Sequence, residues 1–183
     1  MATRDRWLDE GLAVLAEQGE AGVRVDRVAA RLGLTKGSFH HHFGGAEDYR
    51  LALLERHERD QRAALARAEA ELADAPAESV FAALADRARE LLGTDLERAV
   101  RAWSVTDPAA RSVQERLDRA RLEFLSRLWK RRLGDGARAR AAALLPHLVV
   151  AGIGVVQPRP AEDEIRAVFE LLAESAPGAA PDS

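Results

Sequence analysis

Glycine and proline divide this chain into segments whose apolar residues recur every three or four positions, and this feature constrains the fold most. The first segment follows Thr3, which can cap a helix, and carries Leu8, Leu12 and Leu15 before Gly19 ends it. That spacing places the three leucines on one face of an α-helix. The alternation of apolar and polar residues that marks a strand is absent from the sequence. We therefore predict an all-α fold.

The composition supports this prediction. Of the 183 residues, 37 are alanine and 25 are arginine, and both types are strong helix formers. Hydrophobic residues make up 47% and charged residues 31%, a balance typical of soluble globular proteins. About nine helices are expected: one between Thr3 and Gly19, then 25–32, 36–42, 46–73, 78–92, 95–105, 108–133, 137–156 and 165–173.

The two short helices predicted between residues 25 and 43 have the spacing of a helix-turn-helix. Ala29 is small enough to let the second helix approach closely, and Gly33 can adopt a positive φ in the turn. Phe39 and Phe43 lie four residues apart and anchor one side of the second helix. The outer side then carries Lys36, Ser38, His41 and His42, which are hydrogen-bond donors near a helix N-terminus, where the dipole favours phosphate. An ordinary helical hairpin would show the same spacing.

The run RVDRVAARLGLTKGSFHHHF, residues 24–43, resembles the signature of TetR-family transcriptional regulators. A preceding helix and a long helix after a short glycine link also match that family. The resemblance implies a three-helix helix-turn-helix DNA-binding domain over residues 1–45 and a helical ligand-binding and dimerisation domain over residues 46–183. It implies a dimeric repressor that leaves a near-palindromic DNA operator when a small apolar or amphipathic effector binds.

Carried over to this sequence, the resemblance puts Lys36, Gly37 and Ser38 at the DNA-facing start of the recognition helix. Thr35 would cap that helix beside a phosphate, and His41 would approach the backbone or base edges. The predicted DNA-binding residues are Arg24, Arg27, Thr35, Lys36, Gly37, Ser38, His40 and His41.

Three positions depart from the family pattern. Arg24 stands where the family usually has Ser or Thr, His40 where it usually has Tyr, and Ala46 where a Lys often begins the fourth helix. Residues 1–50 also carry seven Lys and Arg against eight Asp and Glu. The predicted DNA-binding domain, called the head below, is therefore not basic overall. A helical small-molecule-binding dimer with a degenerate DNA-binding head is therefore the alternative.

The second domain contains aromatic and histidine side chains suited to a ligand pocket, although core packing alone would also account for each of them. The pocket candidates are His57, Phe81, Trp103, Phe124 and His147. The last two helices would pair with their copies in a two-fold homodimer. The expected interface residues are Leu145, Leu148, Val149, Gly152, Val155, Val156, Ile165, Val168 and Leu172.

Several other classes of protein are not expected. The absence of cysteine excludes disulfides, thiolate metal sites and cysteine nucleophiles. Residues 40–42 are three consecutive histidines, which point about 100° apart on a helix and cannot chelate one metal ion together. No catalytic constellation stands out, so we expect neither an enzyme nor a cofactor. The longest apolar run, residues 144–156, is too short to span a membrane, and we expect a cytoplasmic protein.

Overall fold

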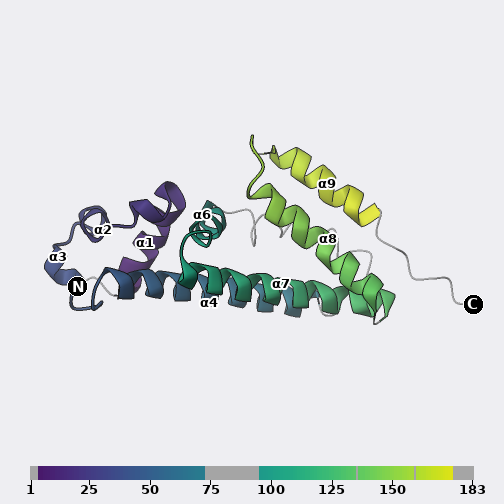
Figure 1. Cartoon of the computed structure of the whole chain (residues 1–183), viewed down its shortest axis with the longest axis horizontal. Helices are drawn as coiled ribbons and strands as arrows, with labels where there is room; N and C mark the ends of the chain where they lie inside the picture. Colours follow the sequence, from purple (N-terminus) through teal and green to yellow (C-terminus); the bar gives the residue numbers. More distant parts are fainter. Residues whose placement is uncertain (1–3, 73–94, 135, 159, 175–183) are drawn as a thin grey trace, which may run out of the picture. The chain divides into compact units, whose positions relative to one another are not determined.

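The computed structural model describes residues 4–72, 95–134, 136–158 and 160–174, and these ranges contain helices and turns but no strand (Figure 1). The all-α prediction is confirmed. The elements are α1 (Arg4–Gln18), the 3₁₀ helix η1 (Glu20–Gly22), α2 (Val25–Leu32), α3 (Lys36–Phe39), α4 (Ala46–Leu72), α6 (Asp95–Trp103), α7 (Pro108–Leu133), α8 (Ala137–Ile153) and α9 (Glu162–Glu174). The helix expected at 78–92 and the cap expected at Thr3 lie outside the described residues.

Most helix boundaries agree with the sequence prediction, but three helices end early. α3 ends at Phe39, because the Phe39 carbonyl accepts the N–H groups of both His42 and Phe43, at 2.9 and 3.1 Å, in a closing turn. α8 ends at Ile153 in a similar turn, where the Gly152 carbonyl accepts two N–H groups. α6 ends at Trp103 rather than at residue 105.

α9 begins three residues earlier than predicted. Its first turn is stabilised by Glu164, whose carboxylate accepts the N–H of Ala161 at 2.7 Å. This contact reaches back from the third helical position to the residue before the helix, as one half of a capping box does. The acidic residues at 162–164 therefore belong to the helix.

The caps of α2, α3 and α7 differ in kind. Asp107 caps α7 by accepting the Ala110 N–H at 2.8 Å, with Pro108 at the first helical position as predicted. Gly33 ends α2 in the left-handed conformation, with φ 68°. Thr35 occupies the N-cap position of α3, but its hydroxyl makes no capping hydrogen bond there, and neither does Arg24 at the start of α2.

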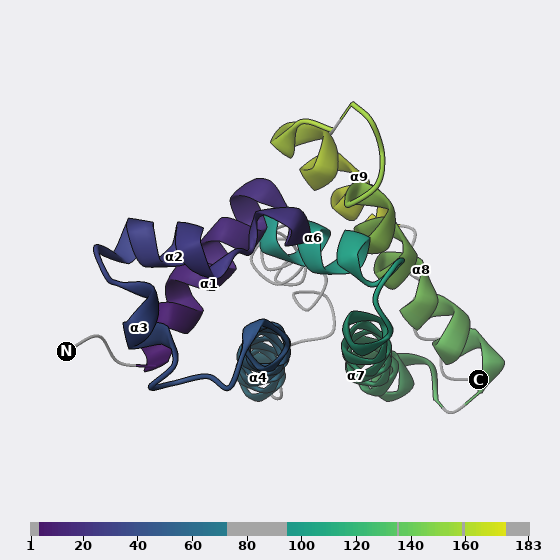
Figure 2. The same cartoon turned by 60° about the vertical axis from the view of Figure 1, so that its left-hand side comes forward.

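The described residues form two compact units, and the first combines residues 4–62 with residues 95–117. Its core is aromatic: the Phe39 ring lies 5.4 Å from both the Trp7 and the Tyr49 rings. The buried Tyr49 hydroxyl donates a 2.5 Å hydrogen bond to the Trp7 carbonyl. Gly11 faces the same tyrosine so closely that a Cβ there would overlap the Tyr49 hydroxyl. Within this unit α6 packs against α1 (Figure 2).

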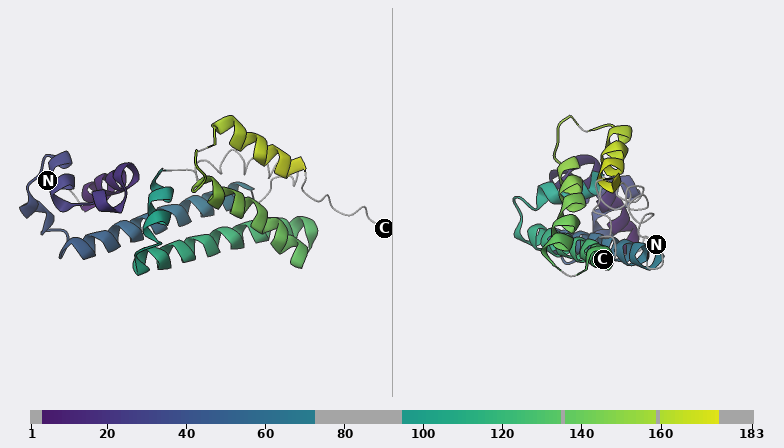
Figure 3. Two further views of the ribbon diagram at one scale, coloured as in Figure 1. Left: turned by 45° about the horizontal axis from the view of Figure 1, so that its top comes forward. Right: turned by 90° about the vertical axis from the view of Figure 1, so that its right-hand side faces the viewer.

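The second unit contains the end of α4 from residue 63, α7 from residue 118, and all of α8 and α9. Its larger core cluster joins α4, α7 and α8 through Leu65, Phe124, Trp129 and Ala143. A smaller cluster around Val150 and Phe169 joins α8 to α9, which run side by side (Figure 3).

The boundaries between the two units fall within α4, after residue 62, and within α7, after residue 117. Residues 46–62 therefore pack with the first three helices. The functional division predicted at residues 45 and 46 is a different boundary and stays a prediction. None of the helices within the described ranges is long and apolar enough to cross a membrane.

Candidate DNA-binding and effector sites

Phe39 fixes the orientation of the short helix α3. Its side chain is 1% exposed and its ring contacts those of Trp7, Phe43 and Tyr49 at centroid distances of 5.1–5.4 Å. The contacts with Trp7 and Tyr49 are edge-to-face, and such arrangements add to the free energy gained by burial. Because one side of α3 is anchored in this cluster, the opposite side faces water.

The eight residues predicted to bind DNA belong to α2, to α3 and to the turns beside these two helices. Seven of them are exposed, and Ser38 is half-buried. A Cβ added to Gly37 would meet only the Thr35 hydroxyl, at 3.7 Å, so the backbone at the start of α3 is open to a close approach. Lys36 forms no ion pair within the described ranges, which leaves its ammonium group available to a phosphate.

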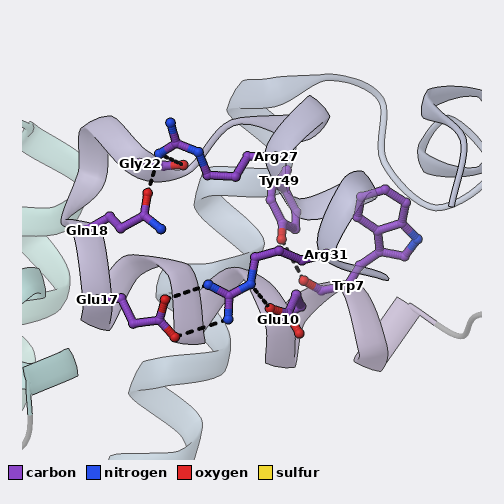
Figure 4. A network of polar contacts seen from close by, with 8 residues as sticks. All are labelled: Trp7, Glu10, Glu17, Gln18, Gly22, Arg27, Arg31 and Tyr49. Atoms are coloured by element: carbon purple, nitrogen blue, oxygen red, sulfur yellow. Dashed lines mark hydrogen bonds and ion pairs between the residues drawn. The ribbon is translucent and has the colours of Figure 1, made fainter. Parts of the chain in front are cut away.

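Two arginines of the predicted patch already have partners in the protein. The Arg27 guanidinium donates hydrogen bonds to the Gln18 side chain and to the Gly22 carbonyl, the latter at 3.3 Å (Figure 4). Arg24 lies 3.5 Å from the Asp26 carboxylate. A phosphate would therefore compete with protein groups for both arginines but not for Lys36.

Arg31 clamps α2 to α1, as Figure 4 shows. Its guanidinium donates to both carboxylate oxygens of Glu17, at 2.5 and 3.1 Å, and forms an ion pair with Glu10. The hydrogen bond from Arg31 holds the pKa of Glu17 below its usual value. The sequence analysis missed this clamp, because no local pattern pairs residue 31 with residues 10 and 17.

The predicted pocket residues are distributed over both units. His57 and Trp103 are buried in the first unit. In the second unit Phe124 is buried in the core, and His147 is half-buried on α8. Phe81 lies outside the described residues. The effector pocket stays a prediction.

A buried polar cluster surrounds Glu97, which the sequence analysis did not single out. Its carboxylate lies 3.3 Å from His57 Nε2 and accepts hydrogen bonds from Gln114 at 3.3 Å and Arg101 at 3.4 Å. A sequence signal was available, because Glu97 has the same three-residue spacing as the buried Val100 and Trp103. A carboxylate on the apolar face of a helix needs buried partners.

Five of the residues expected at the dimer interface are exposed apolar side chains: Leu145 and Leu148 on α8, Val155 and Val156 just after it, and Val168 on α9. Leu148 is 61% exposed and Val155 66% exposed, while Val149 and Ile165 pack partly against the cluster around Val150. A Cβ on Gly152 would meet no atom within 4 Å. The side chain of Leu172 lies outside the described residues.

Comparison with known proteins relates this architecture to a family of regulators. The family model described as bacterial regulatory proteins of the tetR family matches residues 8–52, from within α1 to the first turns of α4. The comparison with curated protein sequences gives no match.

Solved structures share the fold over nearly the whole chain. NemR of Escherichia coli in its reduced form has a TM-score of 0.79 at 16% identity, covering 98% of this chain and 100% of that one. FadR of Bacillus subtilis, a transcriptional regulator in complex with stearoyl-CoA, has a TM-score of 0.68 at 16% identity and covers 94% and 96%. The multidrug binding protein EbrR, complexed with imidazole, has a TM-score of 0.63 at 25% identity and covers 99% and 98%.

The family match and the fold agree with the arrangement built above, in which two short helices joined at Gly33 present an exposed face beside an aromatic anchor. Residues 8–52 therefore form a helix-turn-helix segment of the kind found in the TetR family of bacterial regulatory proteins, which bind DNA.

Proposed function

We propose that this regulator is a dimeric repressor, which binds a near-palindromic operator in the cytoplasm and leaves it when a small apolar or amphipathic effector binds. The observation that carries the proposal is the exposure of Lys36 and Gly37 on α3 and of His41 just after it, next to the buried anchor Phe39. A rigid anchor with an open polar face is what a recognition helix needs to enter a major groove.

The exposed apolar side chains on α8, on α9 and in the segment just after α8 support a dimer. The most exposed of them, Leu145, Leu148, Val155, Val156, Val168 and Leu171, are between 40% and 66% exposed. Monomeric proteins rarely leave a large contiguous apolar surface in water. A two-fold axis through this surface would give each dimer two recognition helices, and DNA with half-sites about 34–36 Å apart would accept both.

Two relatives support a small-molecule effector, since EbrR was solved with imidazole and FadR with stearoyl-CoA. By analogy, residues 46–183 of this chain would hold the effector. Release requires that the effector bind more tightly to the conformation that does not fit DNA. An effector with equal affinity for both conformations would leave the operator occupied.

One observation favours a second candidate, a ligand-binding dimer whose head has lost its affinity for DNA. Arg24 and Arg27 are engaged with Asp26 and Gln18, so fewer cations are free for phosphates. Such a protein would bind a small molecule without recognising any operator.

Fluorescence anisotropy of the purified protein distinguishes the two candidates. The protein is titrated into the labelled intergenic duplex upstream of its own gene and, separately, into a scrambled duplex, at two salt concentrations. Selective binding of two subunits per duplex, weakened at the higher salt concentration, is expected for the repressor. Equally weak binding to both duplexes favours the second candidate.

A further inference from the structure

A groove of about 620 Å³ lies against α7 and the start of α8 in the second unit. Six α7 residues line it at three- and four-residue intervals, as one helix face requires: Arg119, Leu122, Glu123, Ser126, Arg127 and Lys130. Gly136 and Arg140, at the start of α8, complete the lining next to the turn that joins the two helices (Figure 1).

The groove is a positively charged site on a chain whose formal net charge is −3. Among the described residues that line it, four are Lys or Arg and one, Glu123, is acidic. Arg127 is held by Glu69, which accepts hydrogen bonds from its guanidinium at 2.6 and 2.9 Å. Even with Glu69 counted, the cations exceed the carboxylates by two.

Two of the cations are available to a ligand. Arg119 and Arg140 are exposed, and neither guanidinium group has a hydrogen bond or ion pair to any residue in the described ranges. A guanidinium group presents its N–H donors in a planar fork, and this geometry suits a phosphate group particularly well.

The start of α8 adds a further attraction for anions. Gly136 is its N-cap and has no side chain with which to accept the first N–H groups of the helix. A Cβ built on Gly136 would meet no atom within 4 Å, so the space in front of it is open. The helix dipole therefore favours negative charge at the same end of the groove as Arg140.

We propose that this groove binds a phosphorylated small organic molecule. Its phosphates pair with Arg119 and Arg140, and its organic part lies over Leu122. The volume argues for an organic ligand, because about 620 Å³ lies within the 300–1,000 Å³ of typical small-molecule sites and far exceeds the size of a single phosphate ion. None of the residues predicted to form the effector pocket lines this groove, so the ligand is additional to the proposed effector.

Isothermal titration calorimetry with ATP in EDTA at low salt tests this proposal. The groove variant is the double substitution Arg119→Ala with Arg140→Ala. The matched control is Arg138→Ala, which removes an exposed arginine from the first turn of α8 without altering the groove lining. We expect the groove variant to weaken ATP binding at least tenfold and the control to change it less than twofold. An equal loss in the two variants would overturn the proposal, as would the absence of ATP binding to the unsubstituted protein.

Titration with pyrophosphate, which carries phosphate groups but no organic part, tests whether the groove recognises an organic phosphate or phosphate groups alone. Weaker binding of pyrophosphate than of ATP supports contact with the organic part, whereas equal affinity contradicts it. Ser126→Glu, which adds negative charge within the groove, should also abolish binding while the thermal unfolding midpoint stays close to that of the unsubstituted protein. Retained ATP affinity in this variant would place the ligand elsewhere.

Discussion

The Nε2 atom of His57 on α4 lies 3.3 Å from the Oε2 atom of Glu97 on α6, and both side chains are at least 95% buried. The other oxygen of the same carboxylate accepts a hydrogen bond from Gln114 on α7. One carboxylate therefore joins three helices of the first unit. Because α6 also packs against α1, this contact stabilises the part of the unit that supports the DNA-binding head.

Replacing Glu97 with alanine should lower the free energy of unfolding by about 2–3 kcal/mol, because the buried polar groups around it lose a shared acceptor. Urea denaturation measures the change. Glu55→Ala provides the control, since Glu55 is exposed on the same helix as His57 and its loss should cost less than about 0.5 kcal/mol. Equal effects in the two variants would show that the cluster contributes no stability.

Gly11→Ala should destabilise the protein by about 1–3 kcal/mol or more. The added Cβ would overlap the Tyr49 hydroxyl and lie 2.8 Å from Leu53 Cδ2, so the helices must move apart. Gly45→Ala is the matched control, because a Cβ there meets nothing within 4 Å. Thermal unfolding of both variants is the measurement, and an unchanged midpoint for Gly11→Ala would contradict the close packing of α1 and α4.

Lys36→Ala should weaken binding to the operator about fivefold, corresponding to roughly 1 kcal/mol for one lost phosphate contact, and should reduce the salt dependence of the affinity. The thermal unfolding midpoint should not change, because the side chain is exposed. Arg59→Ala removes an exposed cation from α4, outside the predicted DNA-binding patch, and should leave the affinity unaltered. Anisotropy titrations of the three proteins decide whether Lys36 contacts DNA.

Leu148→Glu should convert the proposed dimer to a monomer at micromolar concentration. In the proposed dimer this position is buried against an apolar surface. Burying a charge there costs more free energy than the apolar contact of the residue provides. Sedimentation velocity measures the oligomeric state. Val105→Glu changes an equally exposed apolar residue, 72% exposed, outside α8 and α9, and should leave the dimer intact. Dimers in both variants would refute the interface.

The ion pair between Glu58 and Arg116 should make stability depend on acidic pH. Arg116 donates hydrogen bonds of 2.6–3.1 Å to the Glu58 carboxylate and holds the pKa of Glu58 below its usual value. The stabilisation is therefore full above about pH 4.5 and disappears as the pH falls through the lower pKa of the folded state. Because Arg116 is 43% exposed, the effect is about 1 kcal/mol or less.

Urea denaturation between pH 6 and pH 3 tests this dependence. The protein with Glu58→Gln should be less stable than the unsubstituted protein at pH 6, and the difference should vanish near pH 3. A constant difference across this range would mean that the carboxylate titrates as it does in the unfolded chain.

Much of the fold could be predicted because its determinants are local. The three- and four-residue apolar spacing of Leu8, Leu12 and Leu15 specifies a helix within a single segment, and Gly33 has the left-handed conformation that its position after a helix indicates. The observed helix ends differ from the predicted ones where the last turn depends on a particular hydrogen bond. The Phe39 carbonyl, which ends α3, is one example.

The predicted recognition surface also follows from local sequence, since apolar Phe39 is buried in the aromatic cluster whereas Lys36, beside the turn, is exposed. Which cations remain free on that surface could not be predicted. Arg27 finds its partner nine residues away in Gln18, and this contact forms only when α2 packs beside the end of α1.

The helices, the helix-turn-helix and the resemblance to the tetR family over residues 8–52 were predictable, because each depends on residues a few positions apart. Other contacts follow from the packing of the folded chain: Arg31 clamps two helices, Glu97 joins three, and α7 and the start of α8 form a basic groove. These contacts join residues 14 to 40 positions apart along the chain, and in the groove they join two helices across a turn. Their formation depends on how whole helices pack, which no local pattern of residues specifies.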